Sequence, residues 1–488
     1  MNPVHSPAPE ADAPLRIAVV GHTNVGKTSL LRTLTRRIDF GEVSERPGTT
    51  RHVERVDLRI DGRPAVRFFD TPGLEDAVTL LAHVATLEGA SRPDRIRRFL
   101  GGPEAHGAFE QEAKVLRTLL EVDAAFLVID TRESPLPKYR DEIELLNSCA
   151  RPVMPVLNFV GSPQAAGREG AWRELLAAAG LHAVVRFDAA APFTGAERDL
   201  YHDLGALLPA HREALRGVAA HLAHEAAARR TAACRVIAEG IVDGAALRRE
   251  VPSETMADPK ARQAEVDALR RSVFERAQRG IDDLLALHGF REGDAAEAPL
   301  PQLQGRWTLD LFHPETLRQA GVRLGQGAAV GAAIGVVADL AVAGISLGAG
   351  AAVGGAIGGA LAQGWGPFGR RLMGRLRGVQ ELTVEDGVLF VMADWQLRVL
   401  QGLERRGHGA TTRIAGATTR IADAAAPLPP GRAQALTAAI KAAQPARAHP
   451  EWAEPRRRFG RALTDAAREA VVDAVARSVG GAAAGPSD

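Results

Sequence analysis

The sequence has little cysteine and almost no net charge. Its 488 residues include only two cysteines, Cys149 and Cys234, which lie far apart and show no CxxC spacing. This scarcity suggests neither a disulfide framework nor a zinc site, and it fits a reducing cytosol. Sixty Lys and Arg residues against 59 Asp and Glu residues leave a net charge of +1. A protein that relies on a strong overall field to hold nucleic acid is therefore disfavoured, although a local basic patch stays open.

The N-terminal stretch lacks the pattern of a signal peptide. Residues 1–14 are rich in Pro and Ala and show no basic-then-apolar order, so we expect a disordered leader. The chain is also longer than one hydrophobic core usually serves, which predicts two or more domains. We expect a cytoplasmic protein, and an apolar segment in the second half leaves association with the inner membrane open.

Residues 15–210 alternate short apolar runs with helical stretches, which is the pattern of a parallel sheet flanked by helices. A further run, "VERVDLRID", predicts an antiparallel edge strand. The connection between Leu74 and Val122 is longer than one crossover helix needs, which indicates an insertion. We therefore predict an α/β nucleotide-binding domain with a mainly parallel six-stranded sheet. The other strand candidates are residues 15–21, 65–70, 124–130, 151–158 and 182–188.

Beyond His211 the strand signals stop, and Ala, Arg, Glu and Leu recur at helical spacing. This pattern predicts helical regions at 211–325 and 365–488. Residues 326–364 between them are rich in Gly and Ala and nearly free of charge, with glycines recurring every four residues. Such spacing suits close helix packing and predicts an apolar hairpin. Two interpretations stay open. The segment either forms two short arms that cross a membrane or forms a hairpin buried between soluble helices. Asp339 favours the buried hairpin, because a charge is costly in lipid.

A phosphate-binding motif follows the first strand candidate. "GHTNVGKTS" (Gly21–Ser29) matches GxxxxGK[ST] and opens a predicted helix, which is the context that this motif requires. Its glycines let backbone N–H groups wrap a phosphate at a helix N-terminus. Lys27 is expected to bridge the β- and γ-phosphates, and the Thr28 hydroxyl to bind Mg²⁺.

Two further segments complete a nucleotide site. "FFDTPG" places Asp70 at the end of an apolar strand, where a carboxylate can hold a magnesium-bound water, and the Gly73 N–H group can meet the γ-phosphate. "RPGTTRH" (Arg46–His52) is a polar loop suited to close over the nucleotide and to offer a threonine to the metal. Three motifs in this order make an ordinary tight turn a poor explanation of "GHTNVGKTS".

Through these three motifs, residues 15–210 resemble the Era/TrmE-like branch of small bacterial GTPases. The resemblance implies that Thr50 is the switch I magnesium ligand and that Asn24 holds a potassium ion beside the phosphates. Leu74 falls where Ras-like proteins keep a catalytic glutamine, which implies slow hydrolysis assisted by potassium, by self-association through the GTPase domain, or by a partner. The whole chain also resembles a group of proteobacterial proteins in which such a GTPase domain is joined to a C-terminal domain of unknown function.

The base-reading motif departs from the family pattern. The family has NKxD, whereas this chain has Asn158, Phe159, Val160 and Gly161, so the guanine-reading carboxylate is missing. Phe159 can cover the base by stacking, and Asp188, in "FDAAAP", stands near the family's last base-contacting loop. Asp188 either reaches the guanine edge or caps the following turn, and both interpretations stay open.

We therefore expect a slow GTPase that acts as a GTP-binding switch, with a helical half that associates with a membrane surface or a partner. The alternative is a GTP-dependent RNA or ribosome assembly factor of the Era type, although nucleic acid is the less favoured partner. The expected cofactors are Mg²⁺ and, by resemblance, K⁺. We assign catalysis to Lys27, Thr50 and Gly73. The residues expected to contact the nucleotide are Asn24, Val25, Gly26, Lys27, Thr28, Ser29, Asn158, Phe159 and Asp188. The residues expected to contact a metal ion are Thr28, Thr50, Asp70 and Asn24.

Overall fold

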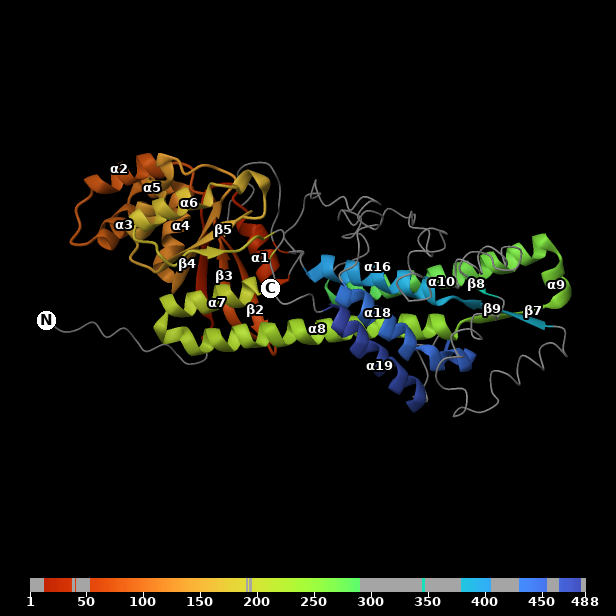
Figure 1. The fold of residues 1–488 in the computed structure, drawn as a ribbon. Coiled ribbons are helices and arrows are strands. Elements are labelled where there is room, and N and C mark those ends of the chain that lie inside the picture. The colour runs from red at the N-terminus through yellow and green to blue at the C-terminus, as the bar shows by residue number, and fades with distance from the viewer. Residues whose placement is uncertain are drawn as a thin grey trace. The chain divides into compact units, whose positions relative to one another are not determined.

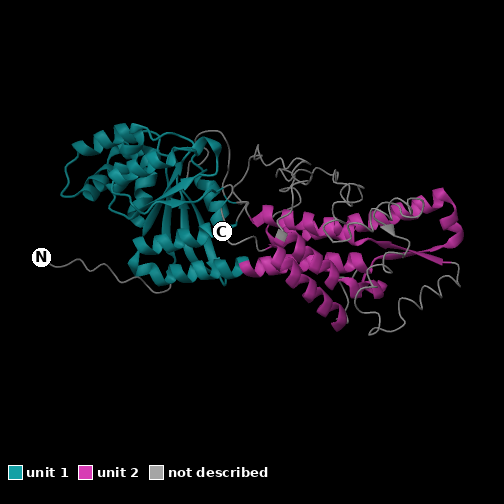
Figure 2. Ribbon diagram, in the orientation of Figure 1, with its two compact units in different colours: residues 1–226, 405–412 teal, residues 227–404, 413–488 magenta. Residues whose placement is uncertain are grey.

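The structure is a computed structural model that forms two compact units. The first unit comprises residues 1–226 and 405–412, and the second comprises residues 227–404 and 413–488 (Figure 2). The division between residues 226 and 227 falls within one long helix, C-terminal to the boundary near residue 210 that the sequence suggests. The structure describes residues 13–36, 40, 53–189, 192, 195–289, 345–346, 379–404, 430–453 and 465–483.

The first unit contains a six-stranded sheet with the order β2-β3-β1-β4-β5-β6 (Figure 1). Strand β2 runs antiparallel to β3, and the other neighbouring pairs are parallel. The predicted six-stranded, mainly parallel sheet with an antiparallel edge is therefore confirmed. The strands are β1 (Leu15–Val20), β2 (Glu54–Ile60), β3 (Arg63–Asp70), β4 (Ala124–Asp130), β5 (Val153–Asn158) and β6 (Val185–Arg186).

Helices cover both faces of this sheet. Alternate residues of β1 enter different hydrophobic clusters: Ile17 packs with α1 and α7, whereas Ala18 packs with α2 to α6. Strands buried on both faces read as continuous apolar runs, which is why β1, β4 and β5 could be recognised from sequence. The helices are α1 (Lys27–Thr35), α2 (Ala77–Thr86), α3 (Arg92–Leu100), α4 (Glu110–Glu121), α5 (Pro137–Asn147), α6 (Glu169–Ala178) and α7 (Ala196–Leu207).

The insertion predicted between β3 and β4 is confirmed. Helices α2, α3 and α4 and a short 3₁₀ helix (Pro103–His106) lie in this connection. Ser91 begins α3 by accepting a hydrogen bond from the Asp94 N–H group, and a proline follows in the first turn. The insertion is thus an ordered helical element that follows the DTPG segment directly.

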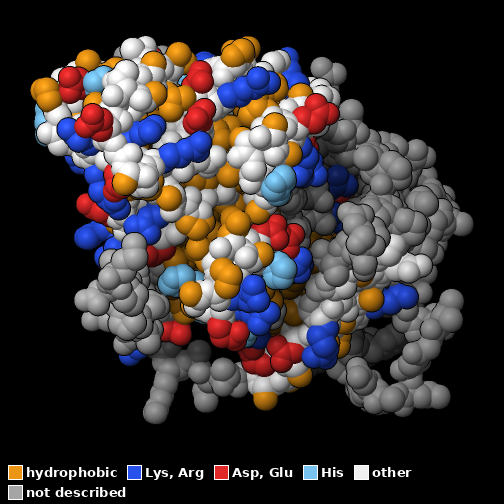
Figure 3. All heavy atoms as spheres, turned by 90° about the vertical axis from the view of Figure 1, so that its left-hand side faces the viewer, with side chains coloured by type: hydrophobic (Ala, Val, Ile, Leu, Met, Phe, Trp, Pro, Cys, Tyr) orange, Lys and Arg blue, Asp and Glu red, His pale blue; other side chains and the backbone are white. Residues whose placement is uncertain are grey.

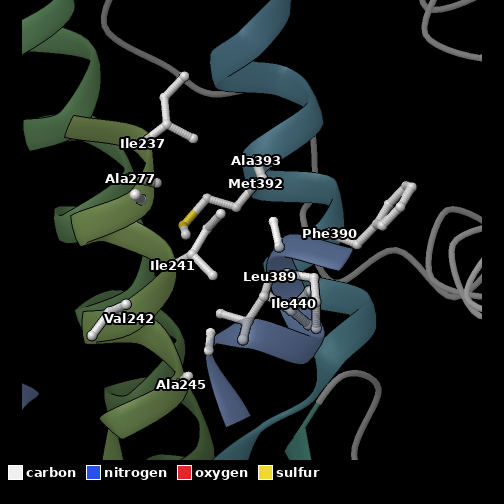
Figure 4. Packing of buried hydrophobic residues seen from close by; sticks show 14 of the residues in the cluster. Ile237, Ile241, Val242, Ala245, Ala277, Leu389, Phe390, Met392, Ala393 and Ile440 are labelled. Atoms are coloured by element: carbon white, nitrogen blue, oxygen red, sulfur yellow. The ribbon is translucent and has the colours of Figure 1, made fainter. Parts of the chain in front are cut away.

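The second unit is mainly helical, as predicted. Side chains of α8, α10, α16 and α18 pack together in its core (Figure 4). Helices α8 and α16 approach closely at Gly244, where a Cβ atom would lie 2.6 Å from Leu389 Cδ2. The helices are α8 (Arg212–Ala246), which continues from the first unit, and α9 (Ser253–Ala257), α10 (Pro259–Leu287), α16 (Asp386–Glu404), α18 (Pro430–Ala442) and α19 (Ala466–Ala483).

The second unit also contains short strands, although strand signals stop beyond His211 in the sequence. Strands β7 (Arg248–Pro252) and β9 (Val379–Val384) pair antiparallel over their whole length, and β8 (Ile345–Ser346) pairs with β9 on its other side. Charged residues interrupt the apolar alternation of β7, and its partner comes from a distant part of the chain. A short strand of this kind gives little local signal because its stability comes from the pairing.

Several predicted features lie outside the described residues. They are the N-terminal leader up to residue 12 and most of the apolar hairpin at 326–364, of which the structure describes only Ile345 and Ser346. Among the helices that the structure describes, none has the length and apolar character needed to cross a membrane.

The face drawn in Figure 3 has a mixed surface. Lys and Arg side chains are interspersed there with Asp and Glu side chains and with apolar ones. Such a face carries no single-sign field for attracting an anionic polymer, which agrees with the net charge of +1.

Candidate nucleotide-binding site

The loop from Gly21 to Gly26 connects the carboxyl end of β1 to the first residue of α1, Lys27. Its backbone needs glycine at both ends. Gly21 and Gly26 have φ values of 142° and 93°, and a Cβ atom on Gly21 would lie 2.5 Å from the Val128 carbonyl oxygen. Asn24 also has a positive φ, 65°, which asparagine adopts more readily than most residues. The loop thus has the tight curvature and the helix N-terminus that suit a phosphate.

The side chain of Lys27 folds back onto this loop. Its Nζ atom donates to the carbonyl oxygens of Gly21 at 3.2 Å and His22 at 2.9 Å, and the residue is only 7% exposed. Burial lowers the pKa of Lys27 to about 8, although Asp70 and Glu142 act in the opposite direction. A phosphate would give this poorly solvated cation a stronger partner than two neutral carbonyl groups.

Thr28 and Asp70 are brought together from α1 and the end of β3. Thr28 Oγ1 donates to Asp70 Oδ2 at 2.5 Å, and the other carboxylate oxygen, Oδ1, is buried without a hydrogen-bond partner. Burial raises the pKa of Asp70 to about 6, while the bond from Thr28 lowers it. Hard oxygen donors with one orphaned carboxylate oxygen fit Mg²⁺, which prefers one or two protein ligands with phosphates and water.

The segment after Asp70 lies against the phosphate loop. A Cβ atom on Gly73 would lie 2.3 Å from Thr23 Oγ1, and the Leu74 N–H group faces the Gly21 carbonyl oxygen at 3.4 Å. Leu74 is fully buried in the core between the sheet and α2 to α6. The residue in the position of the catalytic glutamine is therefore apolar and directed away from solvent.

Asn158 links three loops at the base end of the site. Its Nδ2 atom donates to the Val25 carbonyl oxygen at 2.9 Å. Its Oδ1 atom accepts from the N–H groups of Phe159 and Ala189, both at 2.9 Å. With 1% exposure, Asn158 is buried, so these bonds fix the phosphate loop against the loops that follow β5 and β6.

Phe159 has a cationic neighbour that the sequence reasoning missed. The guanidinium carbon of Arg132 lies 3.8 Å from the centre of the Phe159 ring, in the range of a cation–π contact. Arg132 also donates from Nε and Nη2 to the two oxygens of Asp130, at 2.9 and 2.7 Å. The only sequence signal is the position of Arg132 just after the buried strand β4.

The structure places Asp188 beside Gly161. Its Oδ2 atom accepts from the Gly161 N–H group at 3.4 Å, and a Cβ atom on Gly161 would lie 3.6 Å from this oxygen. The carboxylate therefore lies near the place that a side chain at 161 would occupy. It is 6% exposed, and its contact with Gly161 also suits a loop cap.

Most of the remaining assigned residues lie in the same region. Val25 is buried with its carbonyl oxygen bound to Asn158, and Ser29 lies in the first turn of α1. Thr50 and the rest of the loop from Arg46 to His52 lie outside the described residues. In the part of the chain that the structure describes, no group of three or more His, Cys, Asp or Glu residues is arranged to bind a metal.

Two family profiles match the chain. Residues 16–159 match the family described as "50S ribosome-binding GTPase", and residues 173–477 match the family described as "Domain of unknown function (DUF3482)". Together they account for both units.

Curated relatives that are GTPases match about a quarter of the chain. GTPase Der of Xanthomonas oryzae is 37% identical over 126 residues, which cover 24% of this chain and 25% of that protein. The tRNA modification GTPase MnmE of Alkalilimnicola ehrlichii is 35% identical over 122 residues, which cover 25% of this chain and 21% of that protein. The match thus spans about a quarter of the length of these relatives.

Two solved structures of Era also resemble the chain. Era in complex with MgGDPNP and part of 16S ribosomal RNA shares 22% identity over 36% of this chain and 50% of that chain, with a TM-score of 0.27. A point variant of Aquifex aeolicus Era bound to GDP·AlF4⁻ covers the same shares at 22% identity, with a TM-score of 0.26.

The buried carboxylate of Asp70 generates a prediction about stability. Its folded-state pKa of about 6 lies above the ordinary value of 3.8, so the stability that Asp70 contributes is present below pH 3.8 and lost as the pH rises through about 6. We expect Asp70→Asn to raise the free energy of unfolding of the nucleotide-free protein at pH 7.5 by about 1–3 kcal/mol. Urea unfolding at pH 7.5 and pH 5 measures this gain, which should shrink at pH 5.

The same variant should lose any stabilisation by Mg²⁺ with nucleotide, because a neutral amide is a weaker ligand for this ion. If Asp70→Asn lowers stability equally at both pH values, Asp70 is instead a structural partner of Lys27.

Proposed function

The chain belongs to the DUF3482 family, because the profile of that family spans more than half of its residues, and it carries a P-loop GTPase domain. We propose that it is a switch protein that binds GTP and hydrolyses it to GDP and phosphate. The observation that carries this proposal is the convergence of Lys27, Thr28 and Asp70 at one end of the sheet. A buried ammonium group, a hydroxyl group and a carboxylate with a raised pKa meet there at a glycine-bounded loop.

In this proposal the phosphates occupy the loop between Gly21 and Gly26. Backbone N–H groups at the start of α1 donate to phosphate oxygens, and Lys27 exchanges its two carbonyl partners for the β- and γ-phosphates. Thr28 and Asp70 would hold Mg²⁺, Asp70 by way of a metal-bound water, and the bound ion would supply positive charge next to the phosphates during transfer.

We propose that hydrolysis is slow without help. Leu74 is buried in the core, so it cannot orient the attacking water as a glutamine does in Ras-like proteins. The missing assistance would come from a potassium ion beside Asn24, from a second copy of the GTPase domain, or from a partner. Thr50 is proposed to bind Mg²⁺, as the resemblance of its motif implies.

Phe159, Arg132 and Asp188 form the proposed base site. Phe159 offers an aromatic surface for stacking, and Asp188 offers a carboxylate close to the position of the absent aspartate. Guanine has N1–H and 2-amino donors that a carboxylate can accept, whereas adenine lacks this pair. The arrangement therefore supports guanine as the preferred base.

The helical second half is proposed to associate with a membrane surface or a protein partner under control of the nucleotide. This part of the proposal rests on the sequence of residues 326–364. The alternative, assembly of RNA or ribosomes, is favoured by the description of the family that residues 16–159 match.

The first test is Lys27→Ala. Backbone N–H groups alone cannot balance the phosphate charge, so this variant should lose measurable binding of GTP and GDP. Isothermal titration calorimetry of the full-length protein provides the measurement. Lys114→Ala is the matched control, because Lys114 is a half-buried lysine of α4 that pairs with Glu110. Unchanged GTP affinity in Lys27→Ala would refute the P-loop assignment.

Asp188→Ala tests the base site. A charge-assisted hydrogen bond is worth about 1.5–3 kcal/mol, so GTP affinity should fall roughly ten- to a hundredfold while ATP affinity hardly changes. Asp199→Ala is a suitable control, because Asp199 is an exposed residue of α7 that pairs with Arg198. If Asp188→Ala binds GTP as tightly as the parent, the carboxylate is only a loop cap.

Potassium dependence tests the role of Asn24. GTP hydrolysis should be faster in KCl than in NaCl of the same ionic strength, and Asn24→Ala should remove this difference because the ion loses an oxygen ligand. Phosphate release under single-turnover conditions gives the rates. Equal rates of the parent protein in the two salts would contradict a role in potassium binding. Asn24 would then only shape the loop, a role that its positive φ supports.

A further inference from the structure

A buried carboxylate of the insertion lies beside the segment that follows the DTPG motif. Glu112 belongs to α4 and is 4% exposed. Its Oε1 atom accepts hydrogen bonds from the N–H groups of Glu75 at 3.1 Å and Asp76 at 3.0 Å. These two N–H groups precede α2, where the helix dipole also favours a negative charge. Burying a carboxylate costs free energy unless hydrogen-bond donors offset the loss of water. The two N–H groups therefore stabilise the buried side chain of Glu112.

Three contacts anchor the segment from Thr71 to Asp76, which begins within the DTPG motif, and Glu112 makes one of them. At its start, Thr71 Oγ1 donates to the Val19 carbonyl oxygen of β1 at 2.8 Å. In its middle, the Leu74 N–H group faces the Gly21 carbonyl oxygen. At its end, Glu112 holds Glu75 and Asp76. The first two anchors attach the segment to the sheet and the phosphate loop, whereas the third attaches it to the insertion.

Gly73 lies between these anchors and is packed against Thr23, where a Cβ atom would lie 2.8 Å from the Thr23 nitrogen. A shift of the segment by even one ångström would move the Gly73 N–H group out of hydrogen-bond range of a phosphate placed at the loop. The position of Gly73 therefore depends on what holds the residues on either side of it.

We propose that Glu112 is a positioning residue for the γ-phosphate. By fixing the backbone of Glu75 and Asp76, it holds the Gly73 N–H group at the phosphate loop, so that the protein distinguishes GTP from GDP. This inference rests on the proposed GTP-binding function and deepens it, because it assigns the helical insertion a part in reading the third phosphate.

The test compares two nucleotides on the full-length protein. In Mg²⁺, Glu112→Ala should weaken binding of a non-hydrolysable GTP analogue about tenfold and change GDP affinity less than about twofold, because GDP lacks the phosphate that Gly73 is proposed to contact. Glu112→Gln should retain the parental ratio of the two affinities, since its amide oxygen still accepts both N–H groups. Glu110→Ala, a change at an exposed residue of the same helix, is the matched control.

Equal losses for both nucleotides, or no loss, in Glu112→Ala would overturn the proposal. The proposal would also be overturned if Glu112→Gln lost as much affinity for the GTP analogue relative to GDP as Glu112→Ala does. The charge of Glu112, and not its anchoring of the backbone, would then matter. Amide hydrogen exchange at Glu75 and Asp76 provides a second readout, and it should accelerate in Glu112→Ala without nucleotide. If Glu112→Ala does not fold, Glu112→Asp, which keeps the charge but shortens the side chain, takes its place. If the parent protein binds neither nucleotide, the proposed function is refuted. If amide exchange at Glu75 and Asp76 is also unchanged in Glu112→Ala, the anchoring role of Glu112 is refuted as well.

Discussion

The site depends on one buried amide, that of Asn158. Its three hydrogen bonds join the phosphate loop to the loops that follow β5 and β6. Because an unsatisfied amide is costly inside a protein, these bonds determine the relative positions of loops that are far apart in sequence. This explains how the chain keeps the asparagine of the family's base motif while the lysine and the aspartate are replaced. The retained asparagine holds the loops of the site together.

Burial has opposite effects on the two charged residues at the phosphate end. It lowers the pKa of Lys27 to about 8 and raises that of Asp70 to about 6, so in both residues the charged form is poorly solvated. Opposed shifts of this kind, close together beside a loop that suits an anion, are typical of functional sites. Phosphate and a divalent cation are the ligands that would stabilise both charged forms at once.

The sequence predicted the parts of the molecule whose cause is local. The glycines of the phosphate loop, the apolar strands β1, β4 and β5, and Asp70 at the end of β3 each leave a signal in a few adjacent residues. Arg132, Glu112 and strand β7 do not, because their roles come from contacts with residues distant in the chain: Phe159, the backbone of Glu75, and β9. The position of Asp188 beside Gly161 likewise depends on how β5 and β6 pair.

The central claim is that this chain reads guanine with an altered base site. Isothermal titration of the full-length parent protein with GDP and with ADP, both in Mg²⁺, tests this claim most directly because neither nucleotide can be hydrolysed at a γ-phosphate. The account predicts that GDP binds at least about tenfold more tightly than ADP, the effect of one charge-assisted hydrogen bond. Equal affinities would contradict guanine recognition, and an absence of binding to either nucleotide would contradict the nucleotide site itself.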